Sequence, residues 1–265
     1  MVELFRKKHA LWLEFLFGSF ALPRGQEAEM LYDFALMEYR HLKWLAKAIV
    51  KSGEDFDWNR EPLQLGYSNA KELYARLSDK LMALELAYGK SALFDRIRSD
   101  EKYMLFCLQK APDIAITAFD RNLSYKNLDK TSLDALVLFL LEESYKEYEL
   151  IITYTYSQIH SKDADISLVF EDLIYESMYH LKSFAQLMAK LGILAVPRPV
   201  MEEVYKFEDL KKFLEDGIEE EKAAKEECKK LSQAVKDEEL SRFFDFINNQ
   251  EDYHIELMQE VLAKL

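Results

Sequence analysis

The fold of this chain is decided by two short stretches, YESMYH at residues 175–180 and QEDYH at residues 250–254. Each stretch places a carboxylate about one helical turn before a histidine, so both side chains project from the same face of a helix. A third stretch, EYRH at residues 38–41, repeats the pattern near the N-terminus. Three of the five histidines in the chain lie in this arrangement, which indicates a metal site inside a helical bundle.

The composition is that of an almost wholly helical protein. Hydrophobic residues make up 49% of the 265 residues, and the chain has only seven glycines and five prolines. Because glycine and proline interrupt helices, long helices can run between them, and we expect an all-α fold. The recurrence of apolar residues every three or four positions predicts eight helices, over residues 2–21, 27–52, 68–97, 100–120, 132–160, 165–192, 207–235 and 237–264.

Two long connections indicate how the domains are organised. The segment 121–131 is the most polar connection and the best candidate for a domain boundary. We therefore expect an N-terminal helical domain over residues 1–122 and a four-helix bundle over residues 132–265. The second long connection, 193–206, lies in the middle of the last four helices, where a bundle with one long crossover needs it.

Charge and hydropathy argue against several kinds of partner. A net charge of −13 is unfavourable for binding nucleic acid, since phosphate binding needs a basic surface. No run of 18 apolar residues is present, so we expect no membrane-spanning segment. The apolar N-terminal stretch contains charged residues and lacks a small-residue cleavage site, which argues against a signal peptide. Cys107 and Cys228 are far apart in the sequence, and the expected location is a reducing cytoplasm.

The last four predicted helices contain an internal repeat. A shift of 74 positions places Glu147 on Glu221 and His180 on His254, and in each half the glutamate precedes the histidine by 33 residues. Two helices joined by a tight turn run antiparallel, so residues equidistant from the turn lie side by side. Each hairpin therefore brings a glutamate of one helix level with the carboxylate and histidine of the next. Two such hairpins would direct four helices toward one buried site.

A site of this kind has the ligands that a dinuclear metal centre requires. Iron and manganese bind carboxylate oxygen and imidazole nitrogen, and bridging glutamates hold two ions close together. One position departs from the pattern, because Ser177 stands where a second glutamate is expected and Glu176 comes one residue earlier. The expected cofactor is two iron ions, with manganese or a mixed iron–manganese pair as the alternative. The predicted ligands are Glu147, Glu176, His180, Glu221, Glu251 and His254, with Glu143 and Glu220 as further candidates.

These residues resemble the ferritin-like superfamily, and the rubrerythrins most closely within it. Glu147 is followed seven residues later by Tyr154-Thr155-Tyr156, and GIEEEKAA at residues 217–224 resembles the corresponding helix of the second half. The resemblance covers about residues 132–265. It implies a ferritin-like four-helix bundle, a di-iron centre, and a reaction with peroxide or dioxygen. The chain has no Cys-x-x-Cys pair and so lacks the rubredoxin-type domain of rubrerythrins, which implies an external electron donor.

The N-terminal half carries a partial version of the same pattern. Glu38 and His41 have the carboxylate–histidine spacing, and Glu14 and Glu85 are candidates to face them. A methionine, Met104, stands where a second histidine would fall. This half is therefore either a diverged second ferritin-like bundle with a partial metal site, or a helical scaffold or dimerisation layer. A homo-oligomer is an open alternative.

Three functions are compatible with these features. The first is an oxidoreductase that uses a di-iron or iron–manganese centre to reduce peroxide or activate dioxygen. The second is iron binding or storage without turnover. The third is a metal-free helical interaction protein in which the glutamate–histidine pairs are hydrogen-bonded core residues. We take the first as the prediction from the sequence and keep the others as alternatives.

Overall fold

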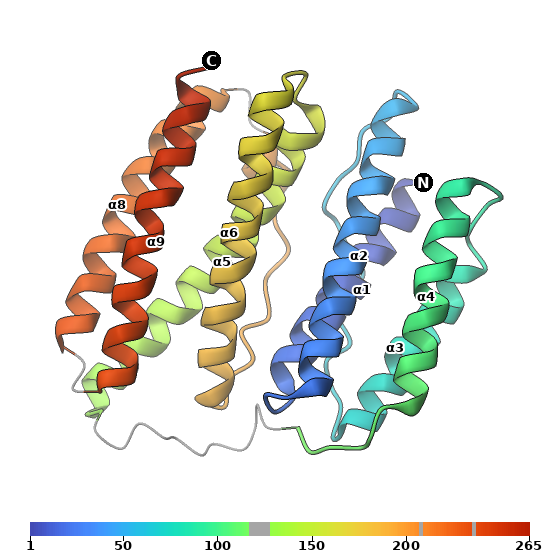
Figure 1. Ribbon diagram of the computed structural model, residues 1–265, viewed down its shortest axis with the longest axis horizontal. Coiled ribbons are helices and arrows are strands. Elements are labelled where there is room, and N and C mark those ends of the chain that lie inside the picture. Colours follow the sequence, from blue (N-terminus) through green and yellow to red (C-terminus); the bar gives the residue numbers. More distant parts are fainter. Residues whose placement is uncertain (117–127, 207–208, 235–236) are drawn as a thin grey trace. The chain divides into compact units, whose positions relative to one another are not determined.

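The computed structural model describes residues 1–116, 128–206, 209–234 and 237–265 (Figure 1). Over these residues the protein has nine helices and no strand, so the prediction of an all-α fold is confirmed. None of these helices is long and apolar enough to cross a membrane. The helices are α1 (Val2–Ala21), α2 (Gln26–Lys51), α3 (Ala70–Glu85), α4 (Ala92–Lys110), α5 (Lys130–His160), α6 (Ala164–Lys190), α7 (Glu202–Tyr205), α8 (Leu210–Ala234) and α9 (Glu238–Leu262).

The chain divides into two compact units. The first comprises Met1–Asn122 together with Ala189–Val200. The second comprises Leu123–Met188 together with Met201–Leu265. Most of the polar segment 121–131, which the sequence indicates as the domain boundary, lies outside the described residues.

The segment Ala189–Val200 belongs to the first unit, although the sequence places it in the C-terminal domain. Helix α6 ends just before Gly192, which adopts the left-handed backbone conformation (φ 78°) that glycine tolerates at helix ends. The chain beyond it is held by a hydrogen bond from the guanidinium of Arg60 to the carbonyl oxygen of Pro197, at 2.8 Å. These two residues are 137 positions apart, so local sequence patterns do not reveal the contact.

In the first unit, four helices pack together around one core. Helix α1 packs against α2 and α3, and α4 also packs against α2 and α3 (Figure 1). The residues of α1 from Lys8 onward are all buried, which agrees with an apolar pattern that runs around the whole helix. Aromatic side chains from the connection between α2 and α3 complete this core, since the Trp58 ring lies 5.1 Å from that of Phe5.

The sequence predicts helices over residues 68–97 and 100–120. In the structure the break between these two helices comes earlier in the chain. Helix α3 ends at Glu85 and α4 begins at Ala92, after the Ser91 side chain accepts a hydrogen bond from the backbone N–H of Phe94. A serine in this position satisfies a backbone donor that the first turn of a helix leaves unpaired. Predicted residues 117–120 of the second helix lie outside the described residues.

In the second unit, helices α5, α6, α8 and α9 surround one core. The Tyr154 ring of α5 lies 5.9 Å from that of Phe170 in α6 and 6.2 Å from that of Phe213 in α8. The Phe139 ring, also on α5, lies 5.7 Å from that of Phe244 in α9. Helices α8 and α9 pack directly against each other (Figure 1). The four long helices therefore meet around α5, and the carboxylate–histidine residues lie on their inner faces.

Replacement of Trp58 by alanine should destabilise the first unit by about 3–5 kcal/mol, because it leaves a large cavity against Phe5. Trp58 is 1% exposed, whereas Leu86 is 91% exposed and serves as the control for truncation. Urea denaturation followed by circular dichroism measures both variants. A Trp58→Ala variant as stable as Leu86→Ala would show that the α2–α3 connection does not contribute to the core.

Candidate metal centre

Five of the predicted ligands come together in the second unit. Helix α5 contributes Glu147, α6 contributes His180, α8 contributes Glu221, and α9 contributes Glu251 and His254. Each is 2% exposed or less, although charged and imidazole side chains rarely lie in a protein interior. Buried apolar residues share these helix faces and direct them to the core: Ile151, Phe184, Ile218, Ile247 and Leu257.

The distances within this cluster are short enough for shared coordination. His180 Nδ1 lies 2.9 Å from Glu147 Oε1 and 3.5 Å from Glu251 Oε1. His254 Nδ1 lies 3.4 Å from the other oxygen of Glu251, Oε2. One donor atom from each of His180, Glu251 and His254 lies within 4.8 Å of the other two. Glu251 therefore stands between the two imidazoles.

Several polar atoms of the cluster are buried and make no hydrogen bond with any residue that the structure describes. They are His180 Nε2, both ring nitrogens of His254, Glu147 Oε2 and Glu251 Oε2. A buried polar group without a partner costs about 1–3 kcal/mol, so proteins rarely retain one without a ligand, water or ion to satisfy it. Nitrogen and oxygen atoms of this type are the donors that iron, manganese and zinc accept. The donor atoms of the cluster and their unused lone pairs are therefore those that a metal ion requires.

Lys146 is the counter-charge of this cluster, and the sequence analysis did not include it. Its Nζ lies 3.3 Å from Glu221 Oε2, and its side chain is 21% exposed. Burial lowers the pKa of Lys146, but the carboxylates of Glu221 and Glu143 outweigh burial and raise it overall. Lys146 immediately precedes Glu147 on α5, and adjacent residues face different directions on a helix. Only its long side chain brings its ammonium back to the cluster.

The carboxyl groups of the cluster affect one another's protonation. Burial raises the pKa of Glu221, but Lys146 and then His254 outweigh burial, so this pKa is lowered overall. Burial, followed by repulsion from Glu221, raises the pKa of Glu251 well above its ordinary value. Burial also lowers the pKa of His180, yet the carboxylate of Glu147 outweighs it and the pKa is raised. Without a bound cation, these shifts favour a proton on Glu251 and on His180 and the charged form of Glu221.

Three other predicted ligands lie at the margin of this cluster. Glu176 is only half-buried, whereas the neighbouring Ser177 is fully buried and its Oγ has no hydrogen-bond partner. The helix therefore directs Ser177, and not Glu176, toward the interior. Glu220 is exposed. Glu143 is half-buried one turn before Glu147, and burial raises its pKa to about 7.

A second cluster lies in the first unit. Donor atoms of Glu38, His41 and Glu101 lie within 4.8 Å of one another, and all three residues are 3% exposed or less. Lys8 of α1 pairs with both Glu38 and Glu101. Burial raises the pKa of Glu38, but Lys8 and then His41 outweigh burial and lower it to about 2. Glu38 and His41 are ligands predicted from the sequence, whereas the roles of Glu101 and Lys8 come from the structure alone.

The structure places Glu14 and Glu85 away from this second cluster. Glu14 is buried, but its Oε1 lies 2.6 Å from Lys80 Nζ and accepts a hydrogen bond from the backbone N–H of Gln64. The Glu85 side chain is 41% exposed and faces Lys102. Both carboxylates are therefore engaged elsewhere, and neither belongs to the residues that gather around His41.

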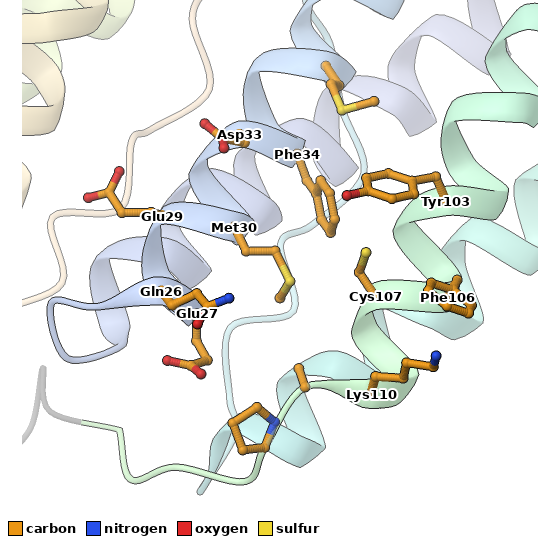
Figure 2. Close-up of a pocket in the computed structure, with 13 residues that line it drawn as sticks. Gln26, Glu27, Glu29, Met30, Asp33, Phe34, Tyr103, Phe106, Cys107 and Lys110 are labelled. Carbon is orange, nitrogen blue, oxygen red and sulfur yellow. The ribbon is translucent and has the colours of Figure 1, made fainter.

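A groove of about 790 Å³ lies between α2 and α4 of the first unit, and it is separate from both clusters. Figure 2 shows Met30 and Phe34 on α2 opposite Tyr103 and Cys107 on α4. Acidic side chains, Glu27 among them, line its rim on α2. The groove shares none of its lining residues with either cluster.

Replacement of Glu143 by glutamine should remove a pH dependence from the stability of the metal-free protein. Folding raises the pKa of Glu143 from its ordinary value of 4.5 to about 7. The folded state therefore holds the proton more tightly, so the contribution of this group to stability is present below pH 4.5 and is lost as the pH rises toward 7. Above pH 7 the variant should be more stable than the parent by about 3 kcal/mol.

Thermal unfolding with a chelator present, from pH 4.5 to pH 8, measures this difference. The exposed neighbour Glu142 provides a matched control, because Glu142→Gln removes the same charge outside the core. Parallel pH profiles for the parent and both variants would contradict the prediction.

Comparisons with protein-family models, with curated proteins and with solved structures found no match to this chain. The resemblance to the ferritin-like superfamily therefore stays a prediction from the sequence. The candidate centre is supported by the burial, the distances and the unpartnered donor atoms of Glu147, His180, Glu251 and His254.

Proposed function

We propose that the second unit binds iron or manganese between α5, α6, α8 and α9 and acts as an oxidoreductase on peroxide or dioxygen. The observation that carries this proposal is the set of buried imidazole and carboxylate atoms that make no hydrogen bond with the described residues. Glutamate and histidine together form the ligand set of dinuclear carboxylate centres in helical bundles. The predicted ferritin-like bundle with a di-iron centre is part of this proposal.

Each residue of the cluster has a distinct part in this proposal. If His180 donates from Nδ1 to Glu147, at 2.9 Å, the lone pair remains on Nε2, which has no partner. A carboxylate that orients a histidine in this way fixes the ring and increases its basicity toward a metal. Glu251 lies between His180 and His254 and would help both histidines to hold a bound metal. Neither nitrogen of His254 makes a hydrogen bond with a described residue, so the lone pair of its neutral ring remains for a metal ion.

Lys146 neutralises Glu221 while no cation is bound, and it limits how strongly the cluster attracts one. The Lys146 side chain is 21% exposed, so its ammonium can turn toward solvent and release Glu221. A second ion needs this release, because the remaining carboxylates are already close to His180 and His254. We therefore propose Glu221 as the ligand that separates single from double occupancy.

A bound iron or manganese pair would supply Lewis acidity and the electrons for reducing peroxide or dioxygen. The chain's own residues hold the site in the core, orient His180 and balance the charge. Electrons would come from an external donor, since the sequence contains only two cysteines and no Cys-x-x-Cys pair. Iron binding without turnover uses the same ligands and is the alternative outcome of the tests below.

Addition of Fe(II) or Mn(II) to chelator-treated protein should raise its melting temperature. An ion at a hundredfold excess over its Kd stabilises the folded state by about 2.7 kcal/mol, because it binds the folded and not the unfolded chain. The combined His180→Ala and His254→Ala variant should lose this response. His160→Ala is the matched control, because His160 is exposed at the end of α5. Differential scanning calorimetry measures the shift, and an unchanged melting temperature in the parent would contradict metal binding.

The same samples separate the two functions that involve metal. Stopped-flow mixing of the Fe(II)-loaded protein with peroxide and an excess of reductant should give repeated turnover that the double histidine variant lacks. A single oxidation without turnover would leave reversible iron binding as the function.

Replacement of Lys146 by methionine should tighten Mn(II) binding by about tenfold, because it removes a positive charge beside the carboxylates. The metal-free variant should be less stable than the parent, since Glu221 then lacks its counter-charge. Lys222→Met is the control, because Lys222 is an exposed lysine that pairs with Glu219 on the outer face of α8. Isothermal titration calorimetry measures both, and unchanged or weaker binding by the Lys146 variant would count against its role as a competing cation.

A further inference from the structure

Lys8 lies at the centre of the second cluster, in the first unit. Its Nζ lies 2.7 Å from Glu101 Oε1 and 3.3 Å from His41 Nδ1, and it pairs with Glu38. An ammonium group has three N–H donors, and here three acceptors surround it. Lys8 is fully buried, so all of its contacts are made within the protein.

The position of Lys8 in the sequence matches that of a predicted metal ligand in the second unit. Lys8 precedes His41 by 33 residues, and Glu147 precedes His180 by the same number. Both pairs also join the first helix of a unit to the second, α1 to α2 and α5 to α6. Lys8 therefore stands where the second unit has a glutamate, so a carboxylate is exchanged for a cation.

The two clusters also differ in how well their histidines are satisfied. His41 uses both ring nitrogens, because Nδ1 faces Lys8 and Nε2 lies 3.2 Å from Asp100 Oδ2. In the second unit, neither ring nitrogen of His254 makes a hydrogen bond with a described residue, and Nδ1 lies 3.4 Å from Glu251 Oε2. A metal ion would need the His41 lone pair that already faces Lys8.

We infer that the Lys8 ammonium takes the cation position of the first unit, which binds no metal while Lys8 is present and becomes a divalent metal site when Lys8 is replaced. The ligands of that site would be Glu38, His41 and Glu101, whose donor atoms lie within 4.8 Å of one another. Lys8 cannot withdraw as Lys146 can, because it is 0% exposed and the Lys146 side chain is 21% exposed. The inference concerns residues of the first unit alone and does not depend on metal binding by the second.

Cobalt(II) titration of the full chain tests this inference, with His180 and His254 both replaced by alanine to remove the ligands of the second unit. Absorption spectroscopy and calorimetry report the number of ions bound. This background should bind no Co(II) in the first unit, and the addition of Lys8→Met should create one equivalent of binding. Methionine is unbranched and uncharged like the stem of lysine, and it is one heavy atom shorter, so it removes the ammonium group itself. A further His41→Ala exchange should abolish the new binding.

Lys7→Met is the matched control, because Lys7 is the adjacent lysine and lies outside the cluster. It should create no site. Binding of Co(II) that needs His41 while Lys8 is intact would overturn the inference. A folded Lys8→Met chain that binds no ion would overturn it equally. A further outcome is that the Lys8→Met variant folds only when Co(II) is added. If that rescue also needs His41, the ion has replaced the ammonium as inferred. Failure of Co(II) to rescue folding would count against the inference.

Discussion

Carboxylates buried at the centre of a helical unit must be neutralised, and the structure around both clusters depends on that requirement. Transfer of one ion from water to a protein interior costs several kcal/mol even after the protein relaxes. The second unit buries Glu147, Glu221 and Glu251 together. Protonation, a neighbouring ammonium and an external cation are the three ways to offset this cost. The raised pKa of Glu251 corresponds to the first, and the contact of Lys146 with Glu221, which lowers the pKa of that carboxyl group, corresponds to the second.

The two units meet the same requirement by different means. In the first unit a single lysine, Lys8, pairs with two carboxylates and faces a histidine whose other nitrogen is also paired. In the second unit the lysine is partly exposed and pairs with Glu221, while His180 and His254 keep nitrogens that make no hydrogen bond with the described residues. A cluster that is closed by its own cation stabilises a helical core. A cluster with unpaired donors is suited to take up a cation from solution.

Much of this organisation could be predicted from the sequence because it depends on local spacing. The low glycine and proline content and the apolar periodicity predict helices, and the structure is all-helical over its described residues. The 33-residue interval between Glu147 and His180 predicts that these side chains face each other, and they lie 2.9 Å apart. The same reasoning overlooked Lys8, since a lysine in an apolar stretch is usually read as a surface residue. It also proposed Glu14, which the structure pairs with Lys80.

The sequence by itself determined the helical class and which helix faces turn inward, because a helix repeats every 3.6 residues and hydrophobic burial selects one face. It also determined that glutamate and histidine would share those faces. Only the tertiary structure decided which polar side chains meet, because a long side chain such as Lys146 reaches atoms that helical spacing alone does not place beside it. It likewise decided that Ser177 faces the core in place of Glu176, and that Lys8 takes the cation position of the first unit. These outcomes depend on contacts between helices, where distance and charge, rather than spacing along the chain, determine the partner.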